Sequence, residues 1–262
     1  MLDFTPYTAV LLDLDGTLCE ANEILPGAAE VVERLRREGR TFAVLSNSTD
    51  SPNQVSRRLA RMGIQMEPAK IFTAAAAAAD FVLHRQPSRP RVFNLATEGI
   101  QELLDGKVDW VKRGDEACDA VVAGAPANVY AADDRQRIAL QLLRNGGAAL
   151  VGTCADRVYP SPRGLEFGSG AFTNFLAYAA NLQPTFCGKP ERIFFEELCN
   201  HLHVQPSGCI LIGDNLEADI MGARAMGMVT VLTLSGITRE QDLSGLPTAR
   251  MPHRVIHDLT DL

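Results

Sequence analysis

The sequence predicts an α/β fold, a Rossmann-like, doubly wound parallel sheet into which a second α/β unit is inserted. Short apolar runs alternate with segments whose apolar residues recur at helical spacing, and this order is typical of parallel sheets with right-handed crossovers. The first apolar run, residues 9–12, contains no polar side chain, as expected of a strand buried on both faces.

The elements of the first unit follow in order along the chain. After a polar connector, a helix is expected over 28–38, a strand over 41–45 and a helix over 54–62. Gly39 and Gly63 end the two helices, because glycine commonly terminates a helix. Beyond residue 187 the alternation resumes with a helix over 190–203, a strand over 209–212, a helix ending at 225, and strands over 229–234 and 254–256.

A second α/β unit is expected in the middle of the chain. Its predicted helices cover 74–83, 98–104, 135–144 and 170–181, and its predicted strands cover 91–96, 120–123 and 148–151. A structureless insert of that length would be unusual in a compact protein. We therefore expect residues 1–73 and 187–262 to form one domain and residues 74–186 to form another.

Charge and composition exclude several classes of protein. The chain has 25 basic and 32 acidic residues, a formal charge of −7, which argues against a nucleic-acid-binding surface. No apolar run reaches the ~20 residues of a membrane helix, and the N-terminus lacks a signal region. Six cysteines are scattered without a C-x-x-C pair, as expected of a reduced, cytoplasmic protein.

Polar side chains follow several predicted strands at the points where the strands end. They are Asp13 and Asp15, Ser46 and Asn47, and Asp214 and Asp219, and Lys189 precedes a predicted helix. In open parallel sheets, ligands bind at the carboxyl ends of the strands. If these groups converge, four carboxylates and one ammonium have a net charge of −3. Two like charges ~4 Å apart repel by about 4 kcal/mol at an effective dielectric constant of 20, so the site requires a cation, and Mg²⁺ prefers oxygen ligands.

Such a set of groups suits phosphoryl transfer. A carboxylate such as Asp13 can accept a phosphoryl group covalently, and a second one, Asp15, can protonate the leaving oxygen and then deprotonate water. A metal ion, Lys189, Ser46 and nearby backbone amides can stabilise the charge of the transition state. A phosphotransferase or mutase, and a non-catalytic phosphoreceiver module, are the alternatives to a hydrolase.

The chain resembles the haloacid dehalogenase (HAD) superfamily, and four motifs in the family's order carry the resemblance. They are Asp13-Leu14-Asp15-Gly16-Thr17-Leu18, Ser46-Asn47-Ser48, Gly188-Lys189-Pro190 and Gly213-Asp214-Asn215-x-x-x-Asp219-Ile220. The large insert between the second and third motifs, with Ile24-Leu25-Pro26-Gly27-Ala28 and Leu234-Ser235-Gly236-Ile237-Thr238, is similar to the NagD-type, nitrophenylphosphatase-like branch. The resemblance implies a HAD-like catalytic core with an inserted α/β cap of the C2 type, subclass IIA.

The resemblance also implies a role for each matched residue. Asp13 matches the nucleophile and Mg²⁺ ligand, and Asp15 matches the acid/base residue, whose backbone carbonyl also binds the metal. Ser46 and the N–H of Asn47 match the phosphate-binding motif, and Lys189 matches the lysine that neutralises nucleophile and phosphate. Asp214 matches a direct metal ligand. Asp219 is expected to hold metal-bound water, and Asn215 to orient Lys189 or water.

One departure concerns the inserted unit. Relatives often have Thr-Asn-x-Asp after the strand that matches 150–151, whereas this chain has Thr153-Cys154-Ala155-Asp156. Thr153 and Asp156 are candidates for substrate contacts, although a polar strand exit explains them equally well. The expected function is Mg²⁺-dependent hydrolysis of a small phosphomonoester, of the sugar phosphate or nucleotide class, through an aspartyl-phosphate. A small phosphorylated metabolite is the expected partner, with no nucleic acid and no membrane. A homodimer is one option for an oligomeric state that the sequence does not decide.

Overall fold

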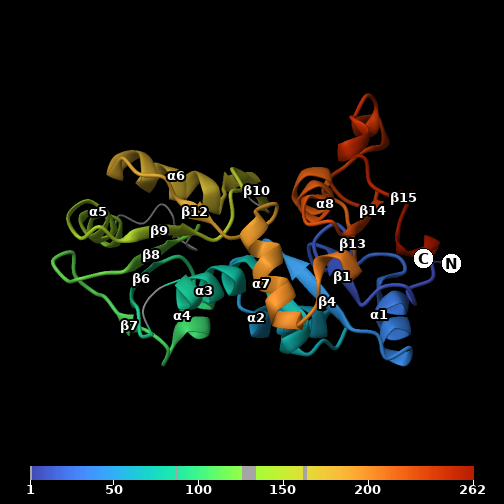
Figure 1. Cartoon of the computed structure of the whole chain (residues 1–262), viewed down its shortest axis with the longest axis horizontal. Helices are drawn as coiled ribbons and strands as arrows, with labels where there is room; N and C mark the ends of the chain where they lie inside the picture. The colour runs from blue at the N-terminus through green and yellow to red at the C-terminus, as the bar shows by residue number, and fades with distance from the viewer. Residues whose placement is uncertain (1, 86–87, 126–133, 162–163) are drawn as a thin grey trace. The chain divides into compact units, whose positions relative to one another are not determined.

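A computed structural model describes residues 2–85, 88–125, 134–161 and 164–262 of the chain (Figure 1). The chain divides into two compact units. The first contains Met1–Ser46, Pro52–Phe72 and Lys189–Leu262, and the second contains Asn47–Ser51 and Thr73–Gly188. Within the described ranges, no helix is long and apolar enough to cross a bilayer.

The first unit is built on a six-stranded sheet in the order β15-β14-β13-β1-β4-β5. The strands are β1 (Ala9–Asp13), β4 (Phe42–Ser46), β5 (Ile71–Thr73), β13 (Cys209–Gly213), β14 (Val229–Thr233) and β15 (Arg254–Ile256). All pairs from β15 to β4 are parallel. The chain first builds outward from β1 to β5 and later outward from β13 to β15, so the strand order reverses between the neighbours β1 and β13. Open α/β sheets bind ligands at such a switch point.

Helices and short helical turns connect these strands. The helices are α1 (Ala28–Arg37), α2 (Pro52–Arg61), α7 (Arg192–Leu202) and α8 (Gly222–Ala225). The turns are η1 (Pro68–Lys70), η2 (Pro206–Gly208), the π-helical η3 (Leu216–Met221), η4 (Glu240–Leu243), η5 (Thr248–Arg250) and η6 (Leu259–Asp261). A small hairpin of β2 (Cys19–Glu20) and β3 (Glu23–Ile24) follows β1.

The core of the first unit lies between the sheet and its helices. Val10, Leu12 and Val44 alternate along the strands on one face and pack with residues of α1 and α2, such as Leu35 and Leu59. On α7, Phe194 and Phe195 are fully buried, and the ring of Phe194 contacts that of Phe72 in β5 with their centroids 5.3 Å apart. Since both faces of the sheet are covered, the central strands are apolar along their whole length.

The second unit has its own parallel sheet in the order β12-β9-β8-β6-β7. Its strands are β6 (Arg91–Leu95), β7 (Asp109–Trp110), β8 (Ala120–Ala123), β9 (Ala149–Gly152) and β12 (Thr185–Phe186). Its helices are α3 (Ala74–Arg85), α4 (Glu98–Leu104), α5 (Arg135–Asn145) and α6 (Ser169–Ala180). An antiparallel hairpin consists of β10 (Val158–Ser161) and β11 (Gly164–Phe167).

The predicted fold class is confirmed, and the structure adds elements that the sequence did not indicate. They include the hairpins β2–β3 and β10–β11 and the short strands β5, β7 and β12. Each of these strands has two to four residues, too few to show the alternation that marks a strand. The segment Asn47–Ser51 joins the second unit because Thr97 Oγ1 donates to the Thr49 carbonyl at 2.6 Å and Ser51 Oγ donates to Glu102 at 2.7 Å.

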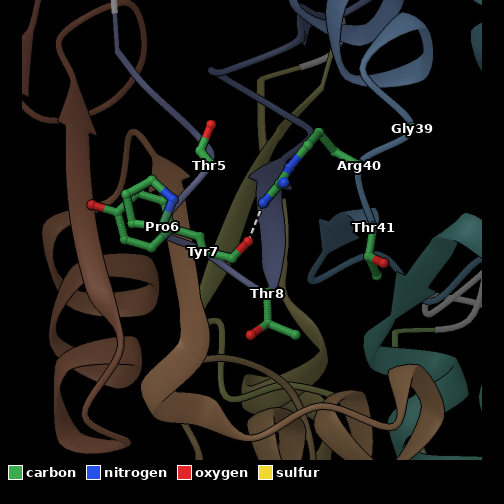
Figure 2. Close-up of a pocket in the computed structure, with 7 residues that line it drawn as sticks. All are labelled: Thr5, Pro6, Tyr7, Thr8, Gly39, Arg40 and Thr41. Carbon is green, nitrogen blue, oxygen red and sulfur yellow. Dashed lines mark hydrogen bonds between the residues drawn. The ribbon is translucent and has the colours of Figure 1, made fainter.

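A polar pocket of about 330 Å³ lies at the amino ends of β1 and β4 (Figure 2). Residues that precede the two strands line it, among them Thr8 and Arg40. The Arg40 guanidinium donates to the backbone carbonyls of Phe4 (2.7 Å) and Tyr7, so it fastens the N-terminal segment to the sheet. This pocket is at the end of the strands opposite to the carboxylates described next.

Candidate active site

The site of the first unit is built where three neighbouring strands end. Asp13 is the last residue of β1, Ser46 is the last residue of β4, and Asp214 directly follows β13. Since these strands are parallel neighbours, their carboxyl ends lie at the same edge of the sheet, on either side of the switch point. The sheet therefore brings together side chains that are up to 201 positions apart in sequence.

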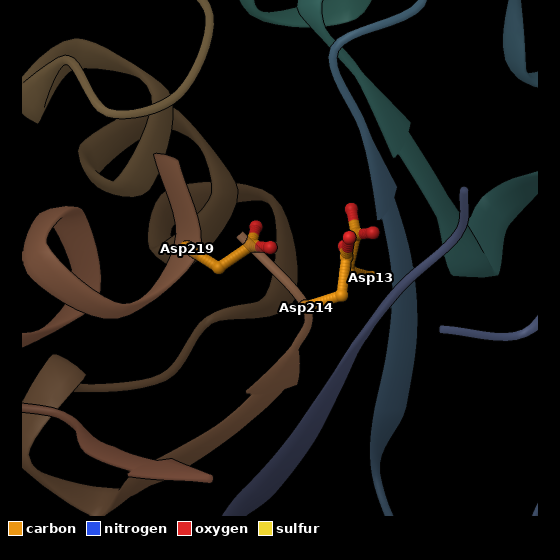
Figure 3. A group of neighbouring side chains, drawn as sticks. All are labelled: Asp13, Asp214 and Asp219. Carbon is orange, nitrogen blue, oxygen red and sulfur yellow. The ribbon is translucent and has the colours of Figure 1, made fainter. Parts of the chain in front are cut away.

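Asp13, Asp214 and Asp219 form a buried carboxylate cluster (Figure 3). One oxygen from each lies within 4.8 Å of the other two. The three residues are only 5%, 4% and 0% exposed. Charges this close and this far from water repel strongly, so the cluster needs positive charge beside it.

Lys189 supplies part of that charge. Its Nζ donates to Asp13 Oδ1 and, at 2.6 Å, to Asp219 Oδ1, and the residue is 4% exposed. Burial by itself would lower the pKa of Lys189, but the carboxylates of Asp13 and Asp219 outweigh it and raise that pKa. The ammonium therefore stays charged at neutral pH.

One ammonium does not balance three carboxylates, and the pKa values of the cluster reflect this. Burial and then the Asp219 charge raise the pKa of Asp13 well above its ordinary value. The same two causes, in the same order, raise the pKa of Asp214 to about 6. With all three carboxylates ionised, they and the one ammonium have a net charge of −2, and all four side chains are almost completely buried. A divalent cation would neutralise this charge.

A loop near the end of the chain holds Asp214 in place. The backbone N–H of Ile237 donates to Asp214 Oδ2 at 2.6 Å. Two glycines leave room for this carboxylate: a Cβ at Gly16 would lie 2.4 Å from Asp214 Oδ2, and a Cβ at Gly236 only 2.0 Å from it. Ser235 Oγ donates to the Gly16 carbonyl at 2.8 Å and so joins the two loops around Asp214.

Asp219 is held by the helical turn η3. Asn215 Oδ1 accepts hydrogen bonds from the N–H groups of Glu217 (3.0 Å) and Ala218 (2.9 Å), which makes Asn215 the N-cap of this turn. The N–H of Asn215 donates to Asp219 Oδ2 at 3.1 Å. The resemblance implied that Asn215 orients Lys189 or water. In the structure its side chain caps the helical turn that carries Asp219.

Asp15 lies outside the buried cluster of the described residues. Its side chain is 51% exposed, and Oδ1 accepts a hydrogen bond from Arg58 Nη2 of helix α2 at 2.5 Å. Oδ2 lies 3.4 Å from Ser46 Oγ. Asp13 and Asp15, two residues apart, therefore have contrasting surroundings, one buried beside Lys189 and the other half exposed beside an arginine.

The remaining predicted residues belong to the second unit. Asn47 follows Ser46 directly in the chain, and its Nδ2 donates to Asp156 Oδ2 at 3.4 Å. Asp156 Oδ2 also accepts from the thiol of Cys154 at 3.1 Å. Thr153 is fully buried, and its Oγ1 has no hydrogen-bond partner among the described residues. Thr153, Cys154 and Asp156 thus lie in the short segment that follows β9, and Asn47 is hydrogen-bonded to the last of them.

The structure identifies site residues that sequence reasoning missed. Arg58 is one, and the backbone N–H of Ile237 is another. The motif containing Ile237 was noted only as part of a family resemblance. A backbone donor leaves no signal in the residue types, and an arginine on an amphipathic helix resembles any other solvated charge.

The cluster fits a hard divalent cation. Its donors are carboxylate oxygens, the type that Mg²⁺ prefers, and three carboxylates beside one ammonium leave negative charge in excess. Among the described residues, Asp13, Asp214 and Asp219 are the one set of three or more acidic, histidine or cysteine side chains whose ligand atoms lie close enough together to share an ion.

Comparisons with known proteins identify the family of the chain. Residues 10–107 match the model of haloacid dehalogenase-like hydrolases, and residues 186–262 match a second model of HAD-hydrolase-like proteins. The 5′-nucleotidase YutF of Bacillus subtilis is 30% identical over 256 residues, 97% of each chain. An acid sugar phosphatase of Staphylococcus epidermidis is 32% identical over 238 residues, 90% of each chain.

A solved structure shows the same fold. The glycerol phosphate phosphatase Rv1692 of Mycobacterium tuberculosis, crystallised in complex with magnesium, superposes with a TM-score of 0.87 at 25% identity. The match covers 98% of this chain and 76% of that one. With whole-length relatives, matching family models and a shared fold, the chain belongs to the haloacid dehalogenase-like hydrolases, in the NagD-type group of subclass IIA.

Proposed function

We propose that this phosphomonoester hydrolase cleaves a small phosphorylated metabolite with the help of Mg²⁺ and through an aspartyl-phosphate on Asp13. The observation that carries the proposal is the buried cluster of Asp13, Asp214 and Asp219 around the ammonium of Lys189 at the switch point of the sheet. A nucleophilic carboxylate, a fixed positive charge and oxygen ligands for a cation are the parts that phosphoryl transfer needs.

The proposed reaction has two steps. A carboxylate oxygen of Asp13 attacks phosphorus, the bond from phosphorus to the leaving oxygen breaks, and Asp15 gives that oxygen a proton. Water then attacks phosphorus and Asp15 takes its proton, while the bond between phosphorus and Asp13 breaks to release inorganic phosphate. Lys189 holds Asp13 in place and offsets the charge of the phosphoryl oxygens, and Ser46 Oγ is a donor at the same edge of the sheet.

Asp13, Asp214 and the backbone carbonyl of Asp15 would hold the metal ion, with Asp219 behind them. When bound, Mg²⁺ supplies positive charge that polarises the phosphoryl group and lowers the repulsion between the phosphate and Asp13. The excess of two negative charges in the cluster supports this assignment. A solved relative that contains magnesium agrees with it.

The proposed substrate class is a sugar phosphate or a nucleotide. The names of the relatives support this range, since they include a 5′-nucleotidase, an acid sugar phosphatase and a glycerol phosphate phosphatase. Thr153 and Asp156 are the proposed substrate contacts of the second unit. The unpartnered, buried Oγ1 of Thr153 supports a polar contact there. A cytoplasmic location is part of the proposal, supported by six buried cysteines, none of which forms a disulfide. A homodimer stays a prediction.

The decisive experiment measures inorganic phosphate released from a panel of phosphorylated metabolites in the presence of Mg²⁺. We expect sustained turnover by the wild-type protein and none by Asp13→Asn, while the matched control Asp115→Asn, an exposed carboxylate, keeps full activity. Phosphate release that survives Asp13→Asn would refute the proposal. Transfer of phosphate to an added alcohol without release of inorganic phosphate would favour a phosphotransferase, and a single stoichiometric phosphorylation without turnover would favour a phosphoreceiver.

A further inference from the structure

Arg58 connects three separate parts of the first unit. The residue lies on α2, and its Nη2 is 2.5 Å from Asp15 Oδ1. The same Nη2 donates to the carbonyl of Ala21 at 3.0 Å and lies 3.5 Å from Cys19 Sγ. Cys19 is in β2, and Ala21 is in the turn between β2 and β3. One guanidinium therefore joins the helix, the hairpin and the aspartate.

The turn at Ala21 is held in an unusual backbone conformation. Ala21 has a φ of 52°, in the left-handed region that residues with a Cβ rarely adopt. The carbonyl that Arg58 binds belongs to this residue. Conformations of this kind persist where the surrounding contacts hold them, and the hydrogen bond from Arg58 is one such contact.

Asp15 depends on its side-chain partners for a fixed orientation. The residue after it, Gly16, has a φ of 88°, and the Asp15 side chain is 51% exposed. Neighbouring side chains do not pack around it as they do around Asp13. Its two oxygens have different partners, with Oδ1 on Arg58 and Oδ2 3.4 Å from Ser46 Oγ. Two different partners determine the rotation of the carboxylate about its own axis.

We propose that Arg58 is a positioning residue for catalysis, which aims the Asp15 carboxylate at the leaving oxygen and ties it to the β2–β3 hairpin. The inference rests on the proposed function, because it requires Asp15 to transfer protons. A proton donor acts only from hydrogen-bond distance of its acceptor, and small errors of placement are costly in rate. A half-exposed ion pair contributes little to folding stability, so its main effect is expected on the reaction.

The test compares two substrates that differ in their need for a proton donor. Departure of p-nitrophenolate needs little protonation, whereas an alkyl phosphate such as glycerol phosphate leaves as an alkoxide unless it is protonated. The value of kcat/KM reports only the steps up to loss of the leaving group. For Arg58→Ala we expect kcat/KM to fall about tenfold or more with the alkyl phosphate and much less with p-nitrophenyl phosphate.

Two further variants separate positioning from a structural effect. Arg57→Ala removes the same charge from an exposed neighbouring position on α2 and should leave both kcat/KM values unchanged. Arg58→Lys should recover part of the loss with the alkyl phosphate, because an ammonium can still donate to Asp15. Equal losses on both substrates in Arg58→Ala, or losses no larger than those of Arg57→Ala, would overturn the inference and leave the proposed function intact. A wild-type protein that releases phosphate from neither these two substrates nor the metabolite panel would overturn both.

Discussion

Lys189→Met tests the electrostatics of the carboxylate cluster directly. The substitution keeps an unbranched side chain of similar length and removes the ammonium that lies between Asp13 and Asp219. At the 2.6 Å that separates Nζ from Asp219 Oδ1, the attraction is about 6 kcal/mol at an effective dielectric constant of 20. The cost of burying the ammonium offsets much of this, and breaking a buried ion pair typically costs about 3–5 kcal/mol.

We therefore expect the free energy of unfolding of the metal-free variant to fall by about 3–5 kcal/mol. The pKa of Lys189 is raised above its ordinary value of 10.5, so its stabilisation is complete at neutral pH and would be lost only as the pH rises through that raised value. The loss is measured by urea denaturation with a chelator present. Mg²⁺ should raise the unfolding midpoint more in the variant than in the wild type, because a cation then replaces the missing charge.

The matched control is Lys107→Met, an exposed lysine, which should change the free energy of unfolding by less than about 0.5 kcal/mol. The reasoning is refuted if Lys189→Met and Lys107→Met unfold at the same urea concentration. An equal response to Mg²⁺ in the variant and the wild type would refute the charge argument in the same way.

Three further predictions concern other parts of the first unit. Gly16→Ala should abolish activity, because the added Cβ would lie 2.4 Å from Asp214 Oδ2. The control is Gly39→Ala, also at positive φ but with no atom within 4 Å of the added Cβ, which should lose about 1 kcal/mol of stability and remain active. Asp15→Asn should accumulate the aspartyl-phosphate, seen in rapid quench with p-nitrophenyl phosphate as a burst of nitrophenol followed by slow turnover; a steady-state rate equal to that of the wild type would remove Asp15 from the mechanism. The pKa of His253 is lowered by burial and by Arg224, and its Nδ1 accepts from the Thr230 N–H at 3.1 Å, so its stabilisation is present above its ordinary pKa of 6.5 and is lost as the pH falls below it. Melting temperatures between pH 8 and pH 5 should therefore fall more steeply in the wild type than in His253→Gln, and identical slopes would contradict this.

Most of the architecture was predictable because local patterns encode it. Apolar runs such as residues 9–12 and 209–212 are typical of buried strands, and their alternation with amphipathic helices implies a parallel sheet. The short strands β5 and β12 were not predicted, because they form only where a neighbouring strand offers its free edge. The attachment of residues 47–51 to the second unit likewise depends on hydrogen bonds from Thr97 and Ser51, which no local pattern indicates.

The sequence by itself determined where the chemistry had to be. Asp13 ends one buried apolar run and Asp214 follows another, so both were expected at the carboxyl edge of the sheet, and the mutual repulsion of the carboxylates called for a cation. The tertiary structure alone decided which acidic side chains are buried together and which one lies apart from them. Asp219 joins the buried cluster through Lys189 and η3, whereas Asp15 turns to Arg58. That division depends on how α2 and the Ile237 loop pack against the strand ends, and packing between segments distant in the chain leaves no trace in the residues of either segment taken alone.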